Sequence, residues 1–514
     1  MLTLLMYLTA AAGSCPTASI PSNDWQEAPD VDAAADAVAK LEAYAFPAQM
    51  DEDGRTGVRT DGLVIARGDT ILYERYGRDF TADTPHLQWS ASKSVATTLT
   101  GMAAHRGYLD IDASICDHVT SARPESCQIT PRHLMEFSSG LAWRESYEGQ
   151  SPTASSVISM LFGEGVDDMV RFITNHELRD PPGTSYSYSS GDTTLLSGVV
   201  TAAMAKKHGE RFAWTELFEP MGITSAVFEE DRSGVFIGSS YLYLTPRDMA
   251  RYGTLLKNDG CWGQQRMLPE GWMAKASQPL DSLHGRLVDG ELDGVPGWGL
   301  WLNKPVPHLN IEAPDSDTIE FWGPRGHWRQ AIYIVPELDL VIARTGDDRD
   351  DTYAHGALVE LAVAAAKALA PPEPPPPPQT ADVPADPPEV SDPGSDVEEE
   401  TPAPAAPPSV DPVTRWAFEP LPAAVEGTPT AEAPEKYDLG LLKIASGYAA
   451  KEACSCLFVT GRTEEACRAY IKVKPDVAKI KIDWDDKTVR ARSLFMGKVV
   501  AKHISTEEGC RVVD

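Results

Sequence analysis

The pattern of apolar and polar positions divides the first 370 residues into strands near both ends and helices between them. Residues 63–68 (LVIARG) and 71–77 (ILYERYG) are short apolar runs that end at glycine, which is typical of strands. Residues 331–346 (AIYIVPELDLVIARTG) predict a hairpin, and residues 356–370 (GALVELAVAAAKALA) predict a helix that stops before Pro371. This order predicts one sheet shared by both ends, with a mostly helical region inserted between them.

Composition changes sharply after this region. Residues 371–434 hold 20 of the 41 prolines and the acidic run DVEEE, a combination that favours an extended spacer without a core. Residues 435–514 contain strand-like runs (AKIKIDW, TVRARSL, KVVAKHI) and a helical run (GRTEEACRAYI). We therefore expect a globular domain over 24–370, a Pro-rich acidic linker over 371–434 and a small Cys-rich α+β module over 435–514.

The N-terminal segment 1–15, MLTLLMYLTAAAGSC, is a short apolar run that ends in small residues and Cys15. It resembles a bacterial lipoprotein signal, which predicts export, lipidation of Cys15 and a membrane anchor in the periplasm or cell envelope. No Lys or Arg precedes the apolar run, so an ordinary secretory signal and a frayed helix are the alternatives. No stretch reaches the roughly 18 apolar residues that a membrane-spanning helix needs.

Eight cysteines agree with export, because disulfides form in oxidising compartments. Cys116 and Cys127 flank a loop-like stretch and are expected to pair. Cys261 has no obvious partner and is interpreted as a small core residue. The four cysteines of the module allow three pairings, and the sequence does not choose among them. They are Cys454, Cys456, Cys467 and Cys510.

Charge and motif content exclude several classes of function. The chain carries 45 Lys+Arg against 76 Asp+Glu, a net charge of −31, and such an acidic surface repels the phosphates of nucleic acids. The acidic run at 347–351 lacks the spacing of an EF-hand, so we interpret it as a solvated loop without a metal. We expect neither a cofactor nor a metal.

Residues 88–101, QWSASKSVATTLTG, place a lysine three positions after a serine inside an apolar helical run. A helix from Ser90 to about His105 puts Ser90 and Lys93 on one face. Alone, this spacing favours a serine that caps the helix and a solvated lysine in its first turn. The apolar residues around most of the helix predict burial instead, and lysine is costly to bury without a partner or a task. A desolvated Lys93 would have a lowered pKa and could accept the proton of the Ser90 hydroxyl, while the helix N-terminus would favour negative charge nearby.

Three segments in order resemble the serine β-lactamase and penicillin-binding-protein superfamily. They are QWSASKSVATTLTGMAAHRGYLDID, ITPRHLMEFSSGLAW and PPGTSYSYSSGDTTLLSGVV. The likeness covers roughly residues 50–365 and is greatest to the class C-related serine hydrolases that include 6-aminohexanoate-dimer hydrolase. It implies a β-lactamase-like α+β fold, with an antiparallel sheet flanked by helices and a mostly helical subdomain.

The resemblance also implies roles for individual residues. Ser90 would be the nucleophile, Lys93 its activator, and Tyr188 the second-motif phenol that shuttles the proton to the leaving group. The pKa of Tyr188 would have to fall for this task, and we expect a charged Lys93 to lower it. Ser190 stands where class C β-lactamases carry asparagine, in a position to contact substrate. As an alternative, Tyr188 is an aromatic residue of a strand or loop that packs under the second half of the domain.

The third motif of the superfamily, usually Lys-Thr-Gly or His-x-Gly, falls in EFWGPRGHWRQAIYIVPELDLV (320–341). GHWRQ resembles a G-H-x-G-Q pattern in which Arg329 replaces the last glycine. His327 and the backbone near Arg329 are candidates for the site wall and for a second oxyanion donor, and a structural strand histidine is the alternative for His327. Glu145 and Tyr147 match positions near the mouth of the cleft, where they contact substrate or only pack the loop.

These observations predict an exported serine hydrolase that cleaves small ester or amide substrates through an acyl-enzyme on Ser90. A β-lactamase or D-Ala-D-Ala carboxypeptidase is the alternative enzyme. A catalytically silent envelope-binding protein of the same fold is the alternative from another class.

Overall fold

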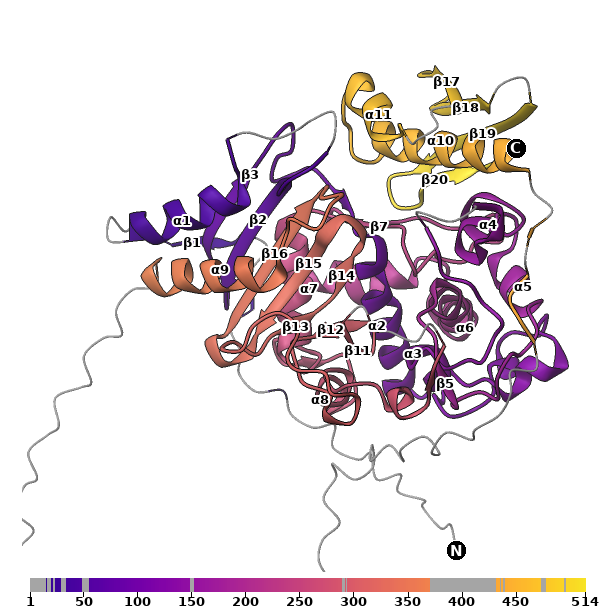
Figure 1. The fold of residues 1–514 in the computed structure, drawn as a ribbon, viewed down its shortest axis with the longest axis horizontal. Helices are drawn as coiled ribbons and strands as arrows, with labels where there is room; N and C mark the ends of the chain where they lie inside the picture. Colours follow the sequence, from indigo (N-terminus) through magenta and orange to yellow (C-terminus); the bar gives the residue numbers. More distant parts are fainter. Residues whose placement is uncertain are drawn as a thin grey trace, which may run out of the picture.

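The structure is a computed structural model (Figure 1). It describes residues 15, 20–21, 24–28, 34–48, 55–147, 152–288, 292, 294–369, 431–434, 436–437, 440–472, 478–493 and 496–514. Residues 1–14 of the predicted signal and residues 370–430, which include most of the predicted linker, lie outside the described residues.

A nine-stranded sheet forms the body of the large domain, and strands from both ends of the domain meet at its centre. Every described pair in it is antiparallel except the pair formed by β1 and β3. Along the sheet the strands are β1 (Gln26–Glu27), β3 (Thr70–Tyr76), β2 (Thr60–Arg67), β16 (Leu340–Gly346), β15 (Gln330–Val335), β13 (Trp322–Gly323), β12 (Leu300–Leu302) and β11 (Val295–Gly297), with β14 (Arg325–Gly326) paired to β15. The predicted α+β class and shared sheet are confirmed.

Both faces of the central strands are buried, which explains why their sequences read as nearly continuous apolar runs. In β16, Val341 and Ala343 belong to one hydrophobic core, while Leu340 and Ile342 belong to the other. Helices α1 (Ala35–Ala45) and α9 (His355–Leu369) lie side by side over one face (Figure 1). Helix α7 (Pro246–Lys257) packs on the opposite face.

Close packing of α7 depends on one glycine. A Cβ built on Gly253 would lie 2.5 Å from Val341 and 2.8 Å from Ile332, so a larger residue there would push the helix off the sheet. The strand-like runs at 63–68 and 71–77, the hairpin at 331–346 and the helix at 356–370 are all found as predicted.

The inserted half of the domain is mostly helical and lies beside the sheet (Figure 1). This half contains a three-stranded sheet in the order β4 (His86–Leu87), β7 (Leu242–Leu244) and β6 (Val227–Phe228). It also contains two separate pairs of short strands. The pairs are β5 (Ser185–Tyr186) with β10 (Arg286–Leu287) and β8 (Cys261–Trp262) with β9 (Gln265–Arg266). The helices are α2 (Ser92–His105), α3 (Pro131–Met135), α4 (Ser156–Phe162), α5 (Met169–Thr174), α6 (Ser190–His208) and α8 (Trp272–Ala276).

The C-terminal module, predicted over residues 435–514, packs two helices on an antiparallel four-stranded sheet above β7 and α4 (Figure 1). The three predicted strands and the helix are present. The long first helix and the last strand were not predicted from the sequence. The elements are α10 (Leu441–Phe458), α11 (Glu464–Tyr470), β17 (Ala478–Asp483), β18 (Thr488–Ser493), β19 (Met496–Ser505) and β20 (Gly509–Val512).

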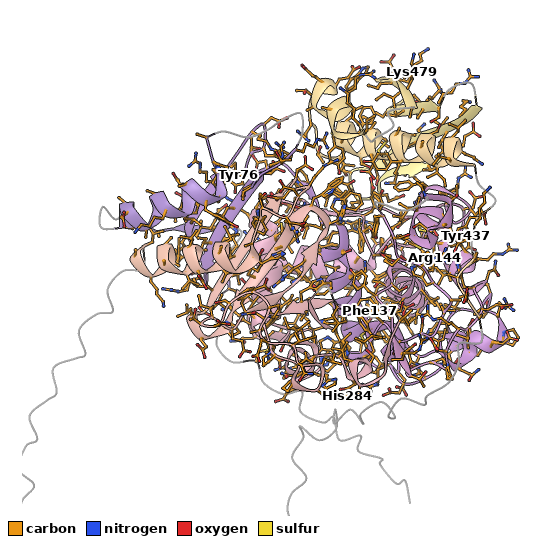
Figure 2. All side chains as sticks on the ribbon, in the orientation of Figure 1. Tyr76, Phe137, Arg144, His284, Tyr437 and Lys479 are labelled. Atoms are coloured by element: carbon orange, nitrogen blue, oxygen red, sulfur yellow. A yellow bond between two sulfur atoms is a disulfide. The ribbon has the colours of Figure 1, made fainter. Side chains whose placement is uncertain are left out.

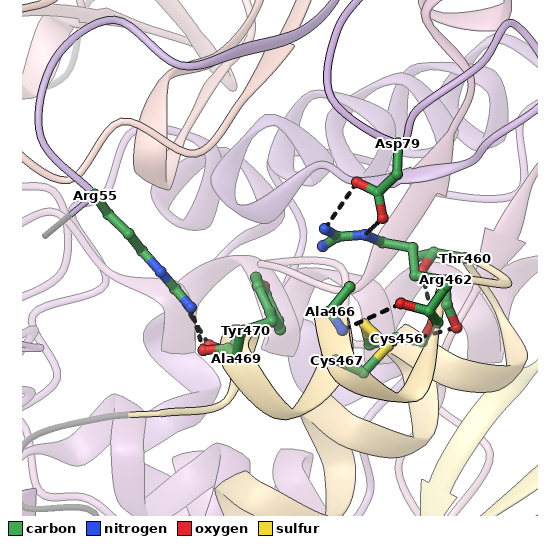
Figure 3. The surroundings of a disulfide bond; sticks show 10 residues. Arg55, Asp79, Cys456, Thr460, Arg462, Ala466, Cys467, Ala469 and Tyr470 are labelled. Atoms are coloured by element: carbon green, nitrogen blue, oxygen red, sulfur yellow. Dashed lines mark hydrogen bonds and ion pairs between the residues drawn. A yellow bond between two sulfur atoms is a disulfide. The ribbon is translucent and has the colours of Figure 1, made fainter. Parts of the chain in front are cut away.

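Four disulfides close loops in the chain. The expected Cys116–Cys127 pair is present. In the module, Cys454 pairs with Cys510 and Cys456 with Cys467, which selects one of the three open pairings. Figure 3 shows the second of these bonds at the start of α11. No described helix combines the length and the apolar character needed to cross a membrane.

The fourth disulfide corrects the interpretation of Cys261, which is bonded to Cys15. It also conflicts with the predicted lipid at Cys15, because a sulfur atom in a disulfide is not available for the thioether bond to a lipid. The two cysteines are 246 positions apart, a separation at which sequence spacing gives no indication of pairing.

Candidate active site

Ser90 lies in a single 3₁₀ turn (Trp89–Ala91) that leads directly into α2. Trp89 has a φ of 48°, in the left-handed region that tryptophan rarely adopts. Such a conformation costs on the order of 1 kcal/mol and persists only where surrounding packing enforces it. The sequence placed the start of the helix at Ser90; the regular α-helix begins two residues later.

Lys93 is buried on the first turn of α2, with 2% of its surface exposed. Its Nζ lies 3.1 Å from Ser90 Oγ, 3.0 Å from Ser190 Oγ and 3.0 Å from the backbone oxygen of Ser239. Burial lowers the pKa of Lys93 to about 8, and the negative charge of Glu145 partly opposes this shift. The buried amine of Lys93 therefore has polar partners on three sides, one of which is the Ser90 hydroxyl.

The three contacts of the Lys93 amine also determine whether its neutral form has a lone pair available to accept a proton. An uncharged amine has two N–H groups and one lone pair. The Ser239 carbonyl can only accept, so it takes one N–H. If the second N–H of Lys93 donates to Ser190 Oγ, the lone pair of the Lys93 nitrogen faces the hydroxyl of Ser90. This arrangement suits a general base better than a structural ion pair.

Tyr188 also reaches the nucleophile and shares a hydrogen bond with the Ser90 side chain. Lys93 Nζ is 5.0 Å from the centroid of its ring, and Phe137 and Trp301 pack against that ring at centroid distances of 4.9 and 5.7 Å. Burial raises the pKa of Tyr188 above its ordinary value. The expectation that Lys93 lowers this pKa is wrong, because the cost of enclosing a phenolate outweighs the other effects.

Ser190 connects Lys93 to a carboxylate. It is the first residue of α6, and Ser189 caps that helix by accepting a hydrogen bond from Asp192 N. Ser190 Oγ lies 2.6 Å from Glu145 Oε1, and Ser190 N donates to Glu145 Oε2 at 2.9 Å. A carboxylate at a helix N-terminus is favoured by the orphan N–H groups and the helix dipole.

Glu145 accepts two further hydrogen bonds from its own loop. Trp143 Nε1 donates at 2.7 Å and the Tyr147 hydroxyl donates at 2.9 Å. The Tyr147 hydroxyl also lies 3.3 Å from Ser190 Oγ, which places Tyr147 at the wall of the site. The sequence left open whether Glu145 packs a loop or contacts substrate; in the structure it organises the polar network behind the base.

The third-motif segment reaches the nucleophile through its backbone at Gly326. A Cβ on this residue would lie 2.1 Å from the backbone oxygen of Gln88 and 3.1 Å from Ala91 N, so only glycine fits. Next in sequence, His327 stacks on Tyr147 with ring centroids 5.5 Å apart and meets the Trp89 ring edge-on at 5.8 Å. His327 therefore contacts the residue that precedes Ser90, and its role in substrate binding stays a prediction.

The contacts of Arg329 differ from those expected of a substrate-binding residue. Its guanidinium approaches Asp351, a fully exposed residue, at 3.4 Å, and its backbone oxygen accepts a hydrogen bond from Arg344. Asp347 and Asp348 in the same acidic run are buried, so that run is not the solvated loop predicted from the sequence. Within the described residues, no group of three or more His, Cys, Asp or Glu side chains is arranged to hold a metal ion.

The three residues predicted from the sequence, a serine, a lysine and a tyrosine, lie together in the structure, and two further groups not predicted from the sequence lie beside them. The Ser239 contribution is a backbone carbonyl, for which a sequence carries no signal. Gly326 did carry a signal, since a glycine beside the third motif indicates close backbone approach.

Comparison with known proteins identifies the family to which this chain belongs. The family model described as Beta-lactamase matches residues 43–364, more than half of the chain. The chain belongs to the beta-lactamase family of serine hydrolases. It is 25% identical over 379 residues to a 6-aminohexanoate-dimer hydrolase of Paenarthrobacter ureafaciens, covering 62% of this chain and 93% of that relative.

A solved structure of a Bacillus anthracis protein classed with the 6-aminohexanoate-dimer hydrolases shares the fold. The TM-score is 0.50 at 18% identity, and the match covers 60% of this chain and 80% of that one. The beta-lactamase-family match ends before the Pro-rich linker, so it does not extend to the C-terminal module.

Proposed function

We propose that this protein is an exported serine hydrolase that cleaves esters or short amides through an acyl-enzyme on Ser90. The observation that carries the proposal is the buried amine of Lys93, 3.1 Å from Ser90 Oγ and held from behind by Ser190 and Ser239. The related 6-aminohexanoate-dimer hydrolase acts on an amide by its name, which supports the substrate class. Four disulfides support export to an oxidising compartment.

In the first step, neutral Lys93 accepts the hydroxyl proton as Ser90 Oγ bonds to the substrate carbonyl carbon. The electron pair of the C=O bond moves to oxygen. The backbone N–H groups of Ser90 and His327 are our candidates to stabilise that oxyanion, because Gly326 brings the second segment against Gln88 and Ala91.

In the second step, the electron pair on the oxyanion re-forms the C=O bond, the bond from carbon to the leaving oxygen or nitrogen breaks, and Tyr188 supplies a proton to that leaving atom. Its raised pKa keeps the phenol protonated, so it serves as the acid and Lys93 as the base. The proton on Lys93 restores Tyr188. Water then attacks the acyl carbon with Lys93 and Tyr188 again moving the proton, which releases the acid and Ser90.

Ser190 and Glu145 favour the positively charged form of Lys93, the proposed base. Lys93 is linked through Ser190 Oγ to the Glu145 carboxylate by contacts of 3.0 and 2.6 Å. A nearby anion stabilises protonated Lys93 after it has taken the serine proton. The pair therefore supports the charge that develops during acylation.

Cationic groups near the third motif are engaged elsewhere, which favours neutral substrates over β-lactams. Arg325 pairs with Asp315 at 2.6 Å, and Arg329 faces Asp351. The segment 318–345 contains no Lys-Thr-Gly, the motif that holds the carboxylate of a β-lactam. The intact contact between Ser90 and Lys93 disfavours the catalytically silent alternative.

Labelling with a fluorophosphonate tests the proposal. We expect covalent modification of the native protein at Ser90, located by peptide mass spectrometry, and none in the Ser90→Ala variant. A protein that stays unlabelled while folded would refute the mechanism, and labelling at another serine would refute the assignment of the nucleophile.

A further inference from the structure

The C-terminal module, to which the proposed mechanism assigns no task, contacts the residues that surround the nucleophile. Trp89 immediately precedes Ser90 and holds a left-handed backbone conformation. Its ring packs against Tyr241, His327 and Trp328, with centroid distances of 5.9, 5.8 and 5.3 Å. Two of these three rings are in turn held by the module.

Tyr241 is held by the first helix of the module. Its hydroxyl donates a hydrogen bond to Glu452 of α10, and Lys451 Nζ lies 4.2 Å from the centre of its ring. All three residues are buried. Lys451 forms a buried ion pair with Glu229 of the hydrolase domain, and Glu229 also accepts a hydrogen bond from Cys510 N at 2.7 Å. Separating such a pair is costly, because each buried charge would lose the partner that compensates it.

Trp328 is held by the second helix of the module. Tyr470 of α11 meets its ring edge-on at 5.8 Å, and the Arg349 guanidinium lies 3.6 Å from the centre of the Trp328 ring. Arg55 donates to the backbone oxygens of Ala469 and Tyr470 at the end of α11 (Figure 3). Trp328 itself has a φ of 54°, a conformation that needs support from its surroundings.

The module also contacts both halves of the hydrolase domain. On the sheet side, Arg462 pairs with Asp79 at 3.1 Å (Figure 3). On the helical side, the hydroxyl of Tyr437, near the start of the module, lies 2.6 Å from Ser156 Oγ and 2.8 Å from His176 Nε2. Figure 2 shows Tyr437 next to Arg144, the neighbour of Glu145. The module therefore bridges the two sides between which Ser90 lies.

We propose that the C-terminal module is a positioning element of the active site. By holding Tyr241 and Trp328, it fixes the ring of Trp89 and so keeps the strained turn that presents Ser90 to Lys93. The inference rests on the proposed function of Ser90. It assigns the module a task in nucleophile reactivity rather than in substrate binding.

The rate at which a fluorophosphonate modifies Ser90 tests this role in the full chain, together with kcat and KM for a p-nitrophenyl ester. We expect Tyr470→Ala to lower the labelling rate and kcat by about 10-fold to 100-fold with little change in KM, as for a small displacement of a reacting group. Tyr470→Phe keeps the ring that contacts Trp328, so its rates should stay close to those of the parent.

Glu507→Gln is the matched control, because it weakens an exposed contact with Arg211 between the module and the hydrolase domain, away from Trp89. Its labelling rate should equal that of the parent. A folded Tyr470→Ala protein that labels at the parental rate would overturn the inference while leaving the proposed function intact. Tyr470→Leu takes its place if the alanine variant does not fold. Failure of the parent itself to label would overturn both.

Discussion

The amine of Lys93 lies 3.0 Å from the hydroxyl of Ser190, so the first turn of one buried helix is tied to the first residue of another. The contact joins the first and second sequence motifs, which are 97 positions apart. Because Ser190 also contacts Glu145, the charge of a partly exposed carboxylate influences the base. The predictions below follow from this network and from the disulfide at Cys15.

Ser90→Ala should abolish ester hydrolysis while leaving the fold intact, because a methyl group cannot attack a carbonyl and Ser90 makes few structural contacts. Circular dichroism and thermal unfolding should match the parent. Lys93→Met should lower kcat by several orders of magnitude, since a serine hydroxyl without a base is a poor nucleophile. Turnover by a folded Ser90→Ala protein would contradict the mechanism.

Activity should rise with pH through about 8, because burial lowers the pKa of Lys93 to about 8 and only its neutral form accepts a proton. Below this value the protonated fraction grows, so log(kcat/KM) should fall by about one for each pH unit. The measurement is a pH profile of p-nitrophenyl ester hydrolysis, corrected for the spontaneous reaction. A profile without an acidic limb between pH 6 and 9 would exclude Lys93 as the titrating base.

Glu145→Gln should shift the acidic limb to lower pH. The negative charge of Glu145 raises the pKa of Lys93, so its removal lets that pKa fall further. Ser190→Ala is the control, because it breaks the hydrogen-bonded link but keeps the charge of Glu145. Ser190→Ala should lower the rate but displace the acidic limb of the pH profile less than Glu145→Gln does. An identical displacement in both variants would argue against a charge effect.

Esters should be better substrates than β-lactams. The evidence is the engagement of Arg325 by Asp315 and of Arg329 by Asp351, together with a serine at position 190 in place of asparagine. We expect kcat/KM for a p-nitrophenyl acyl ester to exceed that for a chromogenic cephalosporin. A cephalosporin value equal to or above the ester value would show that another cation serves the carboxylate.

Non-reducing peptide mapping of protein from an oxidising compartment should recover the Cys15 and Cys261 peptides joined by a disulfide. Reduction should release them as separate peptides. Cys116–Cys127 provides an internal control, because its loop of 11 positions closes without the N-terminal segment. Finding a lipid on Cys15 in the mature protein would contradict this pairing and restore the anchor predicted from the sequence.

The local pattern determined much of the fold. Strands at 63–68, 71–77 and 331–346 and the helix at 356–370 were predictable because each is a short apolar segment with its own glycine or proline boundary. The first helix of the module was missed. Its apolar residues surround most of its axis, because it is covered by the module sheet on one side and the hydrolase domain on the other.

The sequence by itself also indicated Ser90 and Lys93 as candidates, since the lysine lies three positions after a serine within an apolar helix and the segment resembles the nucleophile motif of a known family. Only the tertiary structure decided what surrounds that pair. The carbonyl of Ser239, the carboxylate of Glu145, the backbone at Gly326 and the partner of Cys15 all reach their places through contacts between distant segments. Local sequence sets helix ends and buried faces, but the pKa of Lys93 depends on everything packed around its amine.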